Sequence, residues 1–349
     1  MFLRNCWYMT GWSTDFSADA IVACTLLAEA IVVYRKADGV LAALEDRCCH
    51  RLAPLSVGRR EGDDLRCMYH GLKFAPDGRC VEIPGQDRVP SSIRVRSYPI
   101  VEKHGGAWIW MGAPQKADEA LIPPISGPDD PEWALVSSHL DIEASAGLVC
   151  DNLLDLSHAP FVHANTFGAG DQKVLKVMTR AESSPQLTEL ERGVHIERWH
   201  LNRASNPYNG AQPSDDWVIN EFLAPGIFIL RTRCYGQGVN QRTGEGKPTE
   251  EPILARCTCQ MVTPLTARKT RLFFNFGPWS KEAENRNTYF NIGATAFRED
   301  KAIIEAQQCS IDRSPGRSMR MLAMDRPVAR YNEILKRLLA ADEAVPDHT

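Results

Sequence analysis

The segment CCHRLAPLSVGRREGDDLRCMYHG, residues 48–71, contains two short motifs that each pair a cysteine with a histidine. Cys48 precedes His50 with one residue between them, and Cys67 precedes His70 with two residues between them. A single pair of this kind arises easily by chance. Two mixed pairs so close together predict a metal site rather than ordinary core residues.

The composition of this predicted site distinguishes between two metal centres. Zinc sites with two cysteines and two histidines typically pair Cys with Cys and His with His, at C-x₂₋₄-C and H-x₃₋₅-H spacing. Here each half of the segment supplies one thiolate and one imidazole. That donor set is the requirement of a Rieske-type [2Fe–2S] cluster, in which two histidines replace two cysteines on one iron. The sequence therefore favours the cluster over zinc.

A second group of metal-ligand side chains lies in residues 145–163, where the composition predicts a helix interrupted by a proline. Asn152, Asp155 and His158 follow one another at helical spacing, and His163 comes five residues after His158. Two neutral imidazoles and one carboxylate form the facial triad of non-heme Fe(II) oxygenases, which leaves positions open for O₂. The carboxylate ligand must come from elsewhere in the chain.

The CCHR…CMYHG pattern resembles the cluster signature of the Rieske non-heme iron oxygenases that hydroxylate or demethylate aromatic compounds. The resemblance implies that Cys48 and Cys67 bind one iron of the cluster, and that His50 and His70 bind the other. More loosely, the whole chain resembles the branch of this family that contains vanillate O-demethylase and dicamba monooxygenase.

Two features of the signature depart from the family pattern. Cys49 and Met68 stand where family members often carry proline, and Leu72-Lys73 replaces a more usual aromatic residue. None of these residues is an expected ligand. Cys49 is an alternative to Cys48 as a ligand, but the spacing to His50 favours Cys48.

The pattern Asn152-x-x-Asp155-x-x-His158-x₄-His163 is similar to the family's mononuclear-iron motif, with the two histidines as ligands. In the family the carboxylate ligand lies on a late helix in a Glu-Asp-Lys context, which residues 299–301 match. We therefore expect Asp300 to be the third ligand. The alternatives are Glu299, Glu305 and Asp312.

Asp155 lies about one helical turn before His158 and can accept its free imidazole N–H. In the family the equivalent aspartate also contacts a cluster histidine of a neighbouring subunit, which corresponds to His70. The resemblance thus implies a homotrimer in which one chain's cluster faces its neighbour's iron. Asn152 is expected near the iron as a side chain that is not a ligand.

The distribution of strand and turn signals predicts two domains. Residues 1–115 contain short β-type runs closed by Asp-Gly turns, and a Pro/Gly/Asp-rich connector follows at 122–133. Strand-like and helical segments alternate afterwards, and residues 236–251 read as a surface loop. The predicted class is α+β: an all-β Rieske [2Fe–2S] domain at 1–115, followed at 116–349 by an antiparallel-sheet-plus-helices (helix-grip-like) catalytic domain.

The composition and the motifs of the chain limit which partners and which cellular location we expect. The net charge of −4 gives no reason to expect a nucleic-acid partner. No secretory signal and no apolar run long enough to cross a bilayer are visible, and 11 scattered cysteines form no disulfide framework, so we expect a cytoplasmic protein that does not bind membranes. No dinucleotide or P-loop fingerprint appears. Electrons from NAD(P)H must therefore arrive through a separate reductase or ferredoxin.

The family branch implies a terminal oxygenase that uses O₂ to hydroxylate an O- or N-alkyl group of a small aromatic substrate, with loss of the alkyl group as an aldehyde. The alternatives are an aromatic ring-hydroxylating dioxygenase and a non-catalytic Rieske electron carrier. Phe228, Gln260 and Asn291 are the candidate substrate-binding residues. A substrate carboxylate would require a bidentate arginine such as Arg203, Arg231 or Arg233.

Overall fold

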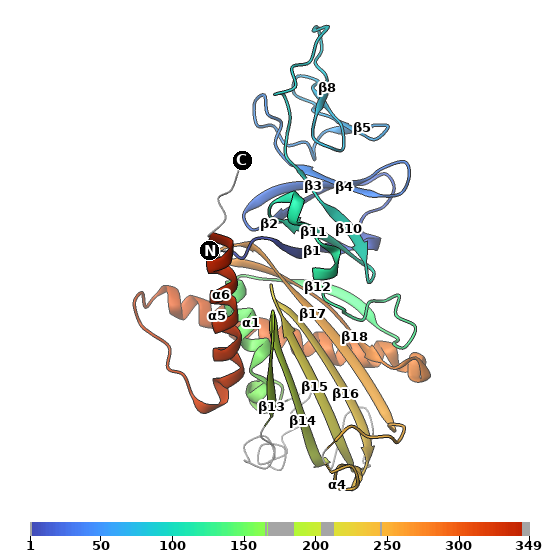
Figure 1. Cartoon of the computed structure of the whole chain (residues 1–349), viewed down its shortest axis with the longest axis vertical. Helices are drawn as coiled ribbons and strands as arrows, with labels where there is room; N and C mark the ends of the chain where they lie inside the picture. Colours follow the sequence, from blue (N-terminus) through green and yellow to red (C-terminus); the bar gives the residue numbers. More distant parts are fainter. Residues whose placement is uncertain (1, 165, 167–184, 204–212, 245, 344–349) are drawn as a thin grey trace. The chain divides into compact units, whose positions relative to one another are not determined.

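The computed structural model describes residues 2–164, 166, 185–203, 213–244 and 246–343. The chain forms two compact units (Figure 1). The first comprises residues 2–122 with the returning segment Thr263–Ala267, and the second comprises Pro123–Val262 with residues 268–343. The division between Ile122 and Pro123 falls at the start of the Pro/Gly/Asp-rich stretch interpreted as a connector.

The described residues of the first unit form three small antiparallel sheets connected by tight turns, as the density of Asp-Gly turns predicts. In spatial order the sheets consist of β1 (Cys6–Trp12), β11 (Gly106–Met111) and β10 (Ile100–Lys103); of β2 (Ile21–Leu26), β3 (Glu29–Arg35), β4 (Leu41–Glu45) and β9 (Ser97–Tyr98); and of β5 (Arg59–Glu61), β6 (Asp64–Arg66), β7 (Lys73–Phe74) and β8 (Cys80–Glu82). Short 3₁₀ helices are η1 (Ser13–Asp15), η2 (Pro114–Lys116) and η3 (Glu119–Leu121).

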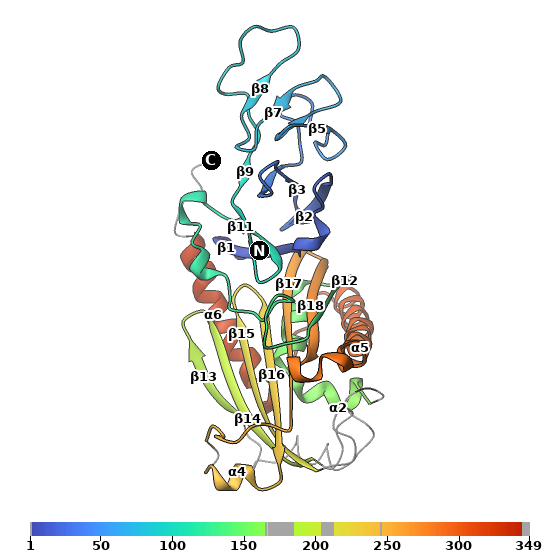
Figure 2. The ribbon, with the colours of Figure 1, turned by 90° about the vertical axis from the view of Figure 1, so that its right-hand side faces the viewer.

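The second unit contains a seven-stranded antiparallel sheet (Figure 2). Its strands, in spatial order, are β12 (Val136–Ile142), β18 (Lys269–Pro278), β17 (Leu254–Thr266), β16 (Ile227–Gly236), β15 (Ser214–Leu223), β14 (Gly193–Arg203) and β13 (Gln186–Leu190). Its helices are α1 (Ala146–Leu154), α2 (Ala159–Val162), α4 (Val239–Arg242), α5 (Arg286–Asp312) and α6 (Arg326–Glu343), with 3₁₀ turns η4 (Leu156–His158), η6 (Ser280–Asn285) and η7 (Ala323–Asp325). The predicted all-β first part and α+β second part are confirmed.

Alternate residues of each strand point to opposite faces of this sheet. One face, here called the inner face, packs against α1, α5 and α6 through residues such as Ile196, Phe222 and Phe228. These side chains share one buried cluster with Leu153 of α1 and Phe297 of α5. The opposite, outer face carries a separate cluster that includes Trp199, Trp217 and Tyr235. Parity along a strand therefore decides whether a side chain can reach the helices.

The helix predicted at 145–163 is divided at Asp155 and not at Pro160. α1 ends at Leu154, and Asp155 adopts extended backbone angles of φ −98° and ψ 90°. Its carboxylate caps the next turn by accepting the N–H of Ser157 at 2.9 Å, and Pro160 lies in the first turn of α2, where proline is tolerated. The aspartate cap, and not the proline, therefore turns the chain.

Two further sequence expectations can be compared with the described residues. Residues 236–251 were expected to be irregular, but Val239–Arg242 form the short helix α4, which begins after Gly238 at a positive φ of 82°. No helix in the described part of the chain is long and apolar enough to cross a membrane.

Candidate metal centres

The loop that carries Cys48 and His50 is a tight turn closed by two backbone hydrogen bonds. Cys48 N donates to Ala53 O at 2.8 Å, and Leu52 N donates to Cys48 O at 2.9 Å. Leu52 occupies the left-handed region at φ 58°, which is uncommon for a residue with a branched side chain. The two hydrogen bonds and the φ of Leu52 define the backbone of the loop that carries both residues.

The loop that carries Cys67 and His70 repeats this arrangement. Cys67 N donates to Leu72 O at 2.8 Å, and Gly71 N donates to Cys67 O at 3.0 Å. Gly71 has φ 78°, and a Cβ atom there would lie 2.7 Å from Pro84 Cγ, so glycine is required on both counts. The two halves of the sequence motif are thus two copies of one backbone turn.

The side chains of the two loops separate by type. Cys48 and Cys67 are each 2% exposed and belong to one apolar cluster, whereas the rings of His50 and His70 are exposed and lie 4.5 Å apart, centroid to centroid. Cys49, by contrast, is exposed. Two adjacent buried thiols and two adjacent surface imidazoles fit a cluster with one Cys₂ iron and one His₂ iron.

The environment of Cys48 bears on how iron would bind. Burial raises the pKa of the Cys48 thiol to about 11, and the nearby Cys67 thiol adds to the rise against an opposing backbone hydrogen bond from His50. The thiol is therefore protonated at neutral pH in the absence of metal, and cluster binding has to displace the proton.

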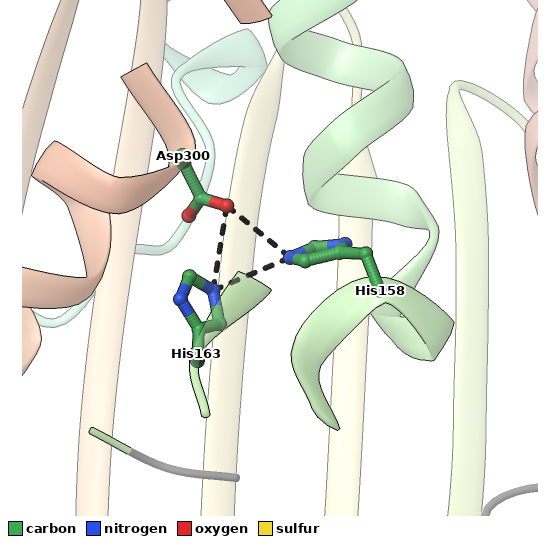
Figure 3. A group of neighbouring side chains, drawn as sticks. All are labelled: His158, His163 and Asp300. Carbon is green, nitrogen blue, oxygen red and sulfur yellow. Dashed lines mark hydrogen bonds and ion pairs between the residues drawn. The ribbon is translucent and has the colours of Figure 1, made fainter. Parts of the chain in front are cut away.

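The second group of ligands comes from three separate elements of the second unit. His158 ends η4, His163 follows α2, and Asp300 lies on α5, and their ligand atoms converge (Figure 3). His158 Nε2, His163 Nε2 and Asp300 Oδ1 are mutually separated by 3.3 Å. His163 and Asp300 are only 5% and 7% exposed. The structure thus brings together the three residues that the sequence proposed.

This triangle fits a first-row divalent metal. Metal bonds to imidazole and carboxylate are about 2.0–2.2 Å long, which places neighbouring ligand atoms of an octahedral ion about 3 Å apart. A separation of 3.3 Å between each pair of ligand atoms is close to that value. Two nitrogens and one oxygen on one side of an ion are the 2-His-1-carboxylate set of non-heme Fe(II) enzymes.

Hydrogen bonds to the far ring nitrogens orient both histidines. His158 Nδ1 lies 2.5 Å from the main-chain oxygen of Asp155, and His163 Nδ1 lies 2.9 Å from Glu299 Oε2. The Thr166 hydroxyl donates to the same Glu299 oxygen at 2.8 Å. Each Nδ1 therefore carries the proton, and each Nε2 is left to bind metal.

Asn152 contacts the carboxylate ligand, and the charges of the ligands shift one another's pKa values. Asn152 Nδ2 donates to Asp300 Oδ1 at 3.1 Å, while its buried Oδ1 has no hydrogen-bond partner in the described part of the chain. Burial alone would raise the pKa of Asp300, but His158 and His163 outweigh it and hold the pKa at about 2. The pKa of His163 is raised, because Asp300 and Glu299 together outweigh the effect of burial.

The other acids considered as the third ligand have different partners. Glu299 faces the Nδ1 side of His163 and not the Nε2 side. Glu305 accepts the backbone N–H of Glu143, and Asp312 pairs with Arg268. Glu299 as the partner of His163 was not predicted, although its position next to Asp300 in the sequence could have suggested that role.

The candidate substrate-binding residues fall into two groups. Phe228 and Gln260 lie opposite each other in the β16–β17 ladder, on the inner face, and are 2% and 3% exposed. Asn291 is exposed on α5. It precedes Asp300 by nine residues, or about two and a half helical turns, which directs it to the opposite side of the helix. The structure therefore does not bring Asn291 to the iron ligands.

The arginines considered for a substrate carboxylate also do not reach this group. Arg231 and Arg233 pair with Ile219 and Trp217 in the β15–β16 ladder, which places them on the outer face, and the Arg203 side chain lies outside the described residues. Arg198 lies on the inner face instead and was not predicted. It shares the parity of Val194 and Ile196, and the alternation that places it there is visible in the sequence VHIERW.

Comparisons with known proteins agree with this geometry. Residues 6–99 match the model of the Rieske [2Fe-2S] domain, and residues 142–341 match that of the vanillate O-demethylase oxygenase C-terminal domain. The chain is 36% identical to the iron-sulfur subunit of a toluene-4-sulfonate monooxygenase system from Comamonas testosteroni, with 98% of each chain covered. It is 30% identical to a vanillate O-demethylase oxygenase subunit from Pseudomonas sp. (strain HR199 / DSM 7063), covering 99% of this chain and 98% of that protein. A crystal structure of dicamba monooxygenase bound to 3,6-dichlorosalicylic acid superposes with a TM-score of 0.85 at 25% identity, over 99% of both chains.

Proposed function

Because the chain belongs to the Rieske non-heme iron oxygenases with a vanillate O-demethylase-type catalytic domain, we propose that it hydroxylates an alkyl carbon carried by a small aromatic substrate. The observation that carries the proposal is the triangle of His158 Nε2, His163 Nε2 and Asp300 Oδ1 in a chain that also holds a Rieske domain. When bound, the cluster supplies electrons one at a time and the mononuclear iron activates O₂.

The reaction defines what the partners must deliver. For a methoxy substrate, ArOCH₃ + O₂ + 2e⁻ + 2H⁺ gives ArOCH₂OH + H₂O, and the hemiacetal then breaks its C–O bond to give ArOH and formaldehyde. The two electrons come from NAD(P)H through a separate reductase or ferredoxin, since the chain is the oxygenase component of a multicomponent system.

The protein side chains position and protect this chemistry. Asp155 O and Glu299 fix the imidazole rings of His158 and His163, so the Nε2 atoms face inward without rearrangement. Asn152 holds Asp300 Oδ1 by its amide nitrogen and directs a free amide oxygen into the same buried region. The apolar cluster that the inner face forms with α1 and α5 would exclude water from a substrate bound beside it.

A second candidate reaction is hydroxylation of a methyl group attached directly to the ring. This reaction is favoured by sequence identity: the chain is 36% identical to the toluene-4-sulfonate monooxygenase subunit but 30% identical to the vanillate O-demethylase subunit. Toluene-4-sulfonate has a ring methyl group but no O- or N-alkyl group. Hydroxylation of a ring methyl yields a stable benzylic alcohol, so no aldehyde is released in that step.

The test is turnover of paired substrates with a ferredoxin and reductase under ¹⁸O₂. A methoxybenzoate that yields formaldehyde and a phenol supports dealkylation. A methylarene that yields a hydroxymethyl product supports the second candidate. A ring diol would instead identify a dihydroxylating oxygenase, and absence of any oxygenated product from a fully metallated protein would contradict the proposal.

We further propose a head-to-tail homotrimer, which the family resemblance implies and two exposed apolar patches support. The cluster patch consists of the exposed residues Leu52, Met68 and Tyr69 of the two cluster loops, and the Tyr69 ring lies 4.0 Å from the His70 ring, centroid to centroid. The iron patch consists of the exposed residues Phe161, in α2, and Leu322 and Met324, at η7. The Ser157 hydroxyl of η4 contacts the Met324 sulfur at 3.1 Å. Exposed apolar groups beside both redox sites are suited to contact between neighbouring chains in a closed ring.

A further inference from the structure

The inner face of the catalytic sheet carries two polar side chains without partners. Asn220 of β15 is 1% exposed, and neither its Nδ2 nor its Oδ1 has a hydrogen-bond partner among the described residues. Arg198 of β14 has a buried Nε without a partner, and it forms no ion pair within the described parts of the chain. Both groups belong to the second unit, which holds the candidate iron ligands.

The strand register places the two side chains together. Ile196 pairs with Asn220 and Arg198 pairs with Val218, so Arg198 and Asn220 are diagonal neighbours on one face. Diagonal neighbours lie about 7–8 Å apart between Cα atoms, within reach of a long side chain. The other diagonal neighbour of Arg198 is Asp216, which accepts a hydrogen bond from the Ser214 hydroxyl at 2.8 Å.

The pair also lies near the end of α1. Ile196 packs in one cluster with Leu153 and Leu154, the last residues of α1 before Asp155. Burial lowers the pKa of Arg198, and the Asp155 carboxylate partly offsets this through its charge, although the two groups form no ion pair in the described structure. Arg198 is therefore within electrostatic reach of the turn that carries His158.

Unpartnered polar groups on one face of the sheet can be satisfied by a polar ligand. A partly buried guanidinium whose Nε has no partner and a fully buried amide without partners are both unfavourable in the folded chain. We propose that Arg198 and Asn220 form an anion subsite of the substrate pocket, which binds the carboxylate or sulfonate group of an aromatic acid. This inference rests on the proposed function for the other end of the substrate, where the alkyl carbon reacts.

The chemistry of the two side chains matches an oxyanion. The planar guanidinium donates two parallel hydrogen bonds to a pair of oxygens, and the Asn220 amide nitrogen donates a third. An aromatic ring is a rigid spacer between this anion and the alkyl group. The names of two relatives agree, since vanillate carries a carboxylate and toluene-4-sulfonate carries a sulfonate.

The experiment measures binding of ligands that have no alkyl group to oxidise. Benzoate and benzenesulfonate are compared with their neutral counterparts benzamide and benzenesulfonamide by calorimetry on the fully metallated protein. We expect wild type to prefer the anion of at least one pair, and the preferred pair identifies carboxylate or sulfonate as the natural group. Arg198→Gln should weaken binding of that anion by about 10- to 100-fold and leave the neutral ligand unchanged.

Two further variants separate the subsite from general damage. Arg231→Gln, on the outer face beside Glu221, is the matched control and should bind the anion like wild type. Asn220→Leu should weaken anion binding several-fold and yet raise the melting temperature of the ligand-free protein, because it removes an unsatisfied buried amide.

Three results would overturn the subsite: no anion preference in wild type, unchanged anion affinity in Arg198→Gln, or equal losses for the anion and its neutral counterpart. The proposed function fails differently. If the anion preference and its dependence on Arg198 are found but no alkylated aromatic acid is oxidised, the subsite stands and the alkyl-hydroxylation proposal is wrong.

Discussion

The main-chain oxygen of Asp155 lies 2.5 Å from His158 Nδ1, so the backbone and not the carboxylate orients this histidine. The carboxylate accepts the N–H of Ser157 instead. The reason is local: α1 ends at Asp155, whose extended backbone angles free the carbonyl from the helix. The expectation that the carboxylate accepts the imidazole N–H named the right residue but the wrong group.

The separate roles of the carbonyl and the carboxylate predict a specific effect of Asp155→Asn. The variant keeps the carbonyl and the Asn side chain can still cap Ser157, so we expect His158 to stay oriented and the mononuclear iron to bind normally. If the carboxylate contacts His70 of a neighbouring subunit, electron transfer between the centres should fall by about 100-fold. Stopped-flow reoxidation of the reduced cluster, followed together with product formation, measures this. Wild-type rates for both would show that the carboxylate serves only as a helix cap.

Glu299→Gln tests the partner of His163. Loss of the charged acceptor on Nδ1 weakens the preference for the tautomer that presents Nε2, so affinity for mononuclear iron should fall by about 10- to 100-fold while the cluster spectrum is unchanged. The measurement is Fe(II) titration of protein that lacks only the mononuclear iron. Glu305→Gln, on the same helix and away from His163, is the control. Equal affinities in the two variants would remove Glu299 from this role.

Iron content separates the two centres. Wild type should contain about three irons per chain, two in the cluster and one at the triad. Cys67→Ala should lose the cluster colour and retain about one iron, whereas His163→Ala should retain the colour and about two irons. Metal analysis with acid-labile sulfide assay checks both. Stoichiometric zinc in place of cluster iron would contradict the assignment of Cys48, His50, Cys67 and His70.

The same two variants test the head-to-tail arrangement. Neither Cys67→Ala nor His163→Ala chains alone should turn over substrate. In mixed trimers the intact cluster of a His163→Ala chain would face the intact iron of a Cys67→Ala chain, so co-expression should restore part of the activity. Met324→Lys within the iron patch should prevent this rescue and lower the oligomer mass by light scattering, whereas Val40→Lys, at an exposed position of the first unit, should do neither. No rescue from verified mixed trimers would rule out electron transfer between chains.

Asp151, one residue before Asn152, should make stability depend on pH. Burial raises its pKa to about 6, with a hydrogen bond to Asn332 opposing and the charge of Asp325 adding to the rise. The pKa of an aspartate in the unfolded chain is about 3.9, so the Asp151 carboxyl binds its proton more tightly in the folded chain. The contribution of Asp151 to stability is therefore most favourable below about pH 4, falls as pH rises to about 6, and stays lower by roughly 2–3 kcal/mol above it. Asp151→Asn should raise the melting temperature by several degrees at pH 8 and by only about a third as much at pH 4.5. A gain of equal size at both pH values would contradict this account.

Much of this molecule could be predicted from the sequence because its chemistry is carried by short motifs. The spacing of Cys48, His50, Cys67 and His70 predicted a cluster domain, and the match of residues 299–301 to the family's Glu-Asp-Lys context implied Asp300. Periodicity and turn signals were sufficient for an all-β part and an α+β part. These features depend on local residue order, which a single sequence displays directly.

Other features depend on register and helix phase, which are set by tertiary packing. Asn291 was proposed from its place on the late helix, but its phase relative to Asp300 turns it to the exposed side. Arg231 and Arg233 were considered for a carboxylate, yet strand parity places them on the outer face and Arg198 on the inner face. The break at Asp155 required knowledge that its side chain caps the next turn.

In the second unit, the described iron ligands come from α5 and from the turns that follow α1, whereas Arg198 and Asn220 come from strands. The residues that would bind iron and those that would select the substrate thus lie on different layers of the fold, the helices and the sheet. A substitution on a strand can redirect the enzyme to another aromatic compound without disturbing a ligand. This separation makes the catalytic unit readily evolvable, since new specificities can be sampled while oxygen activation is preserved.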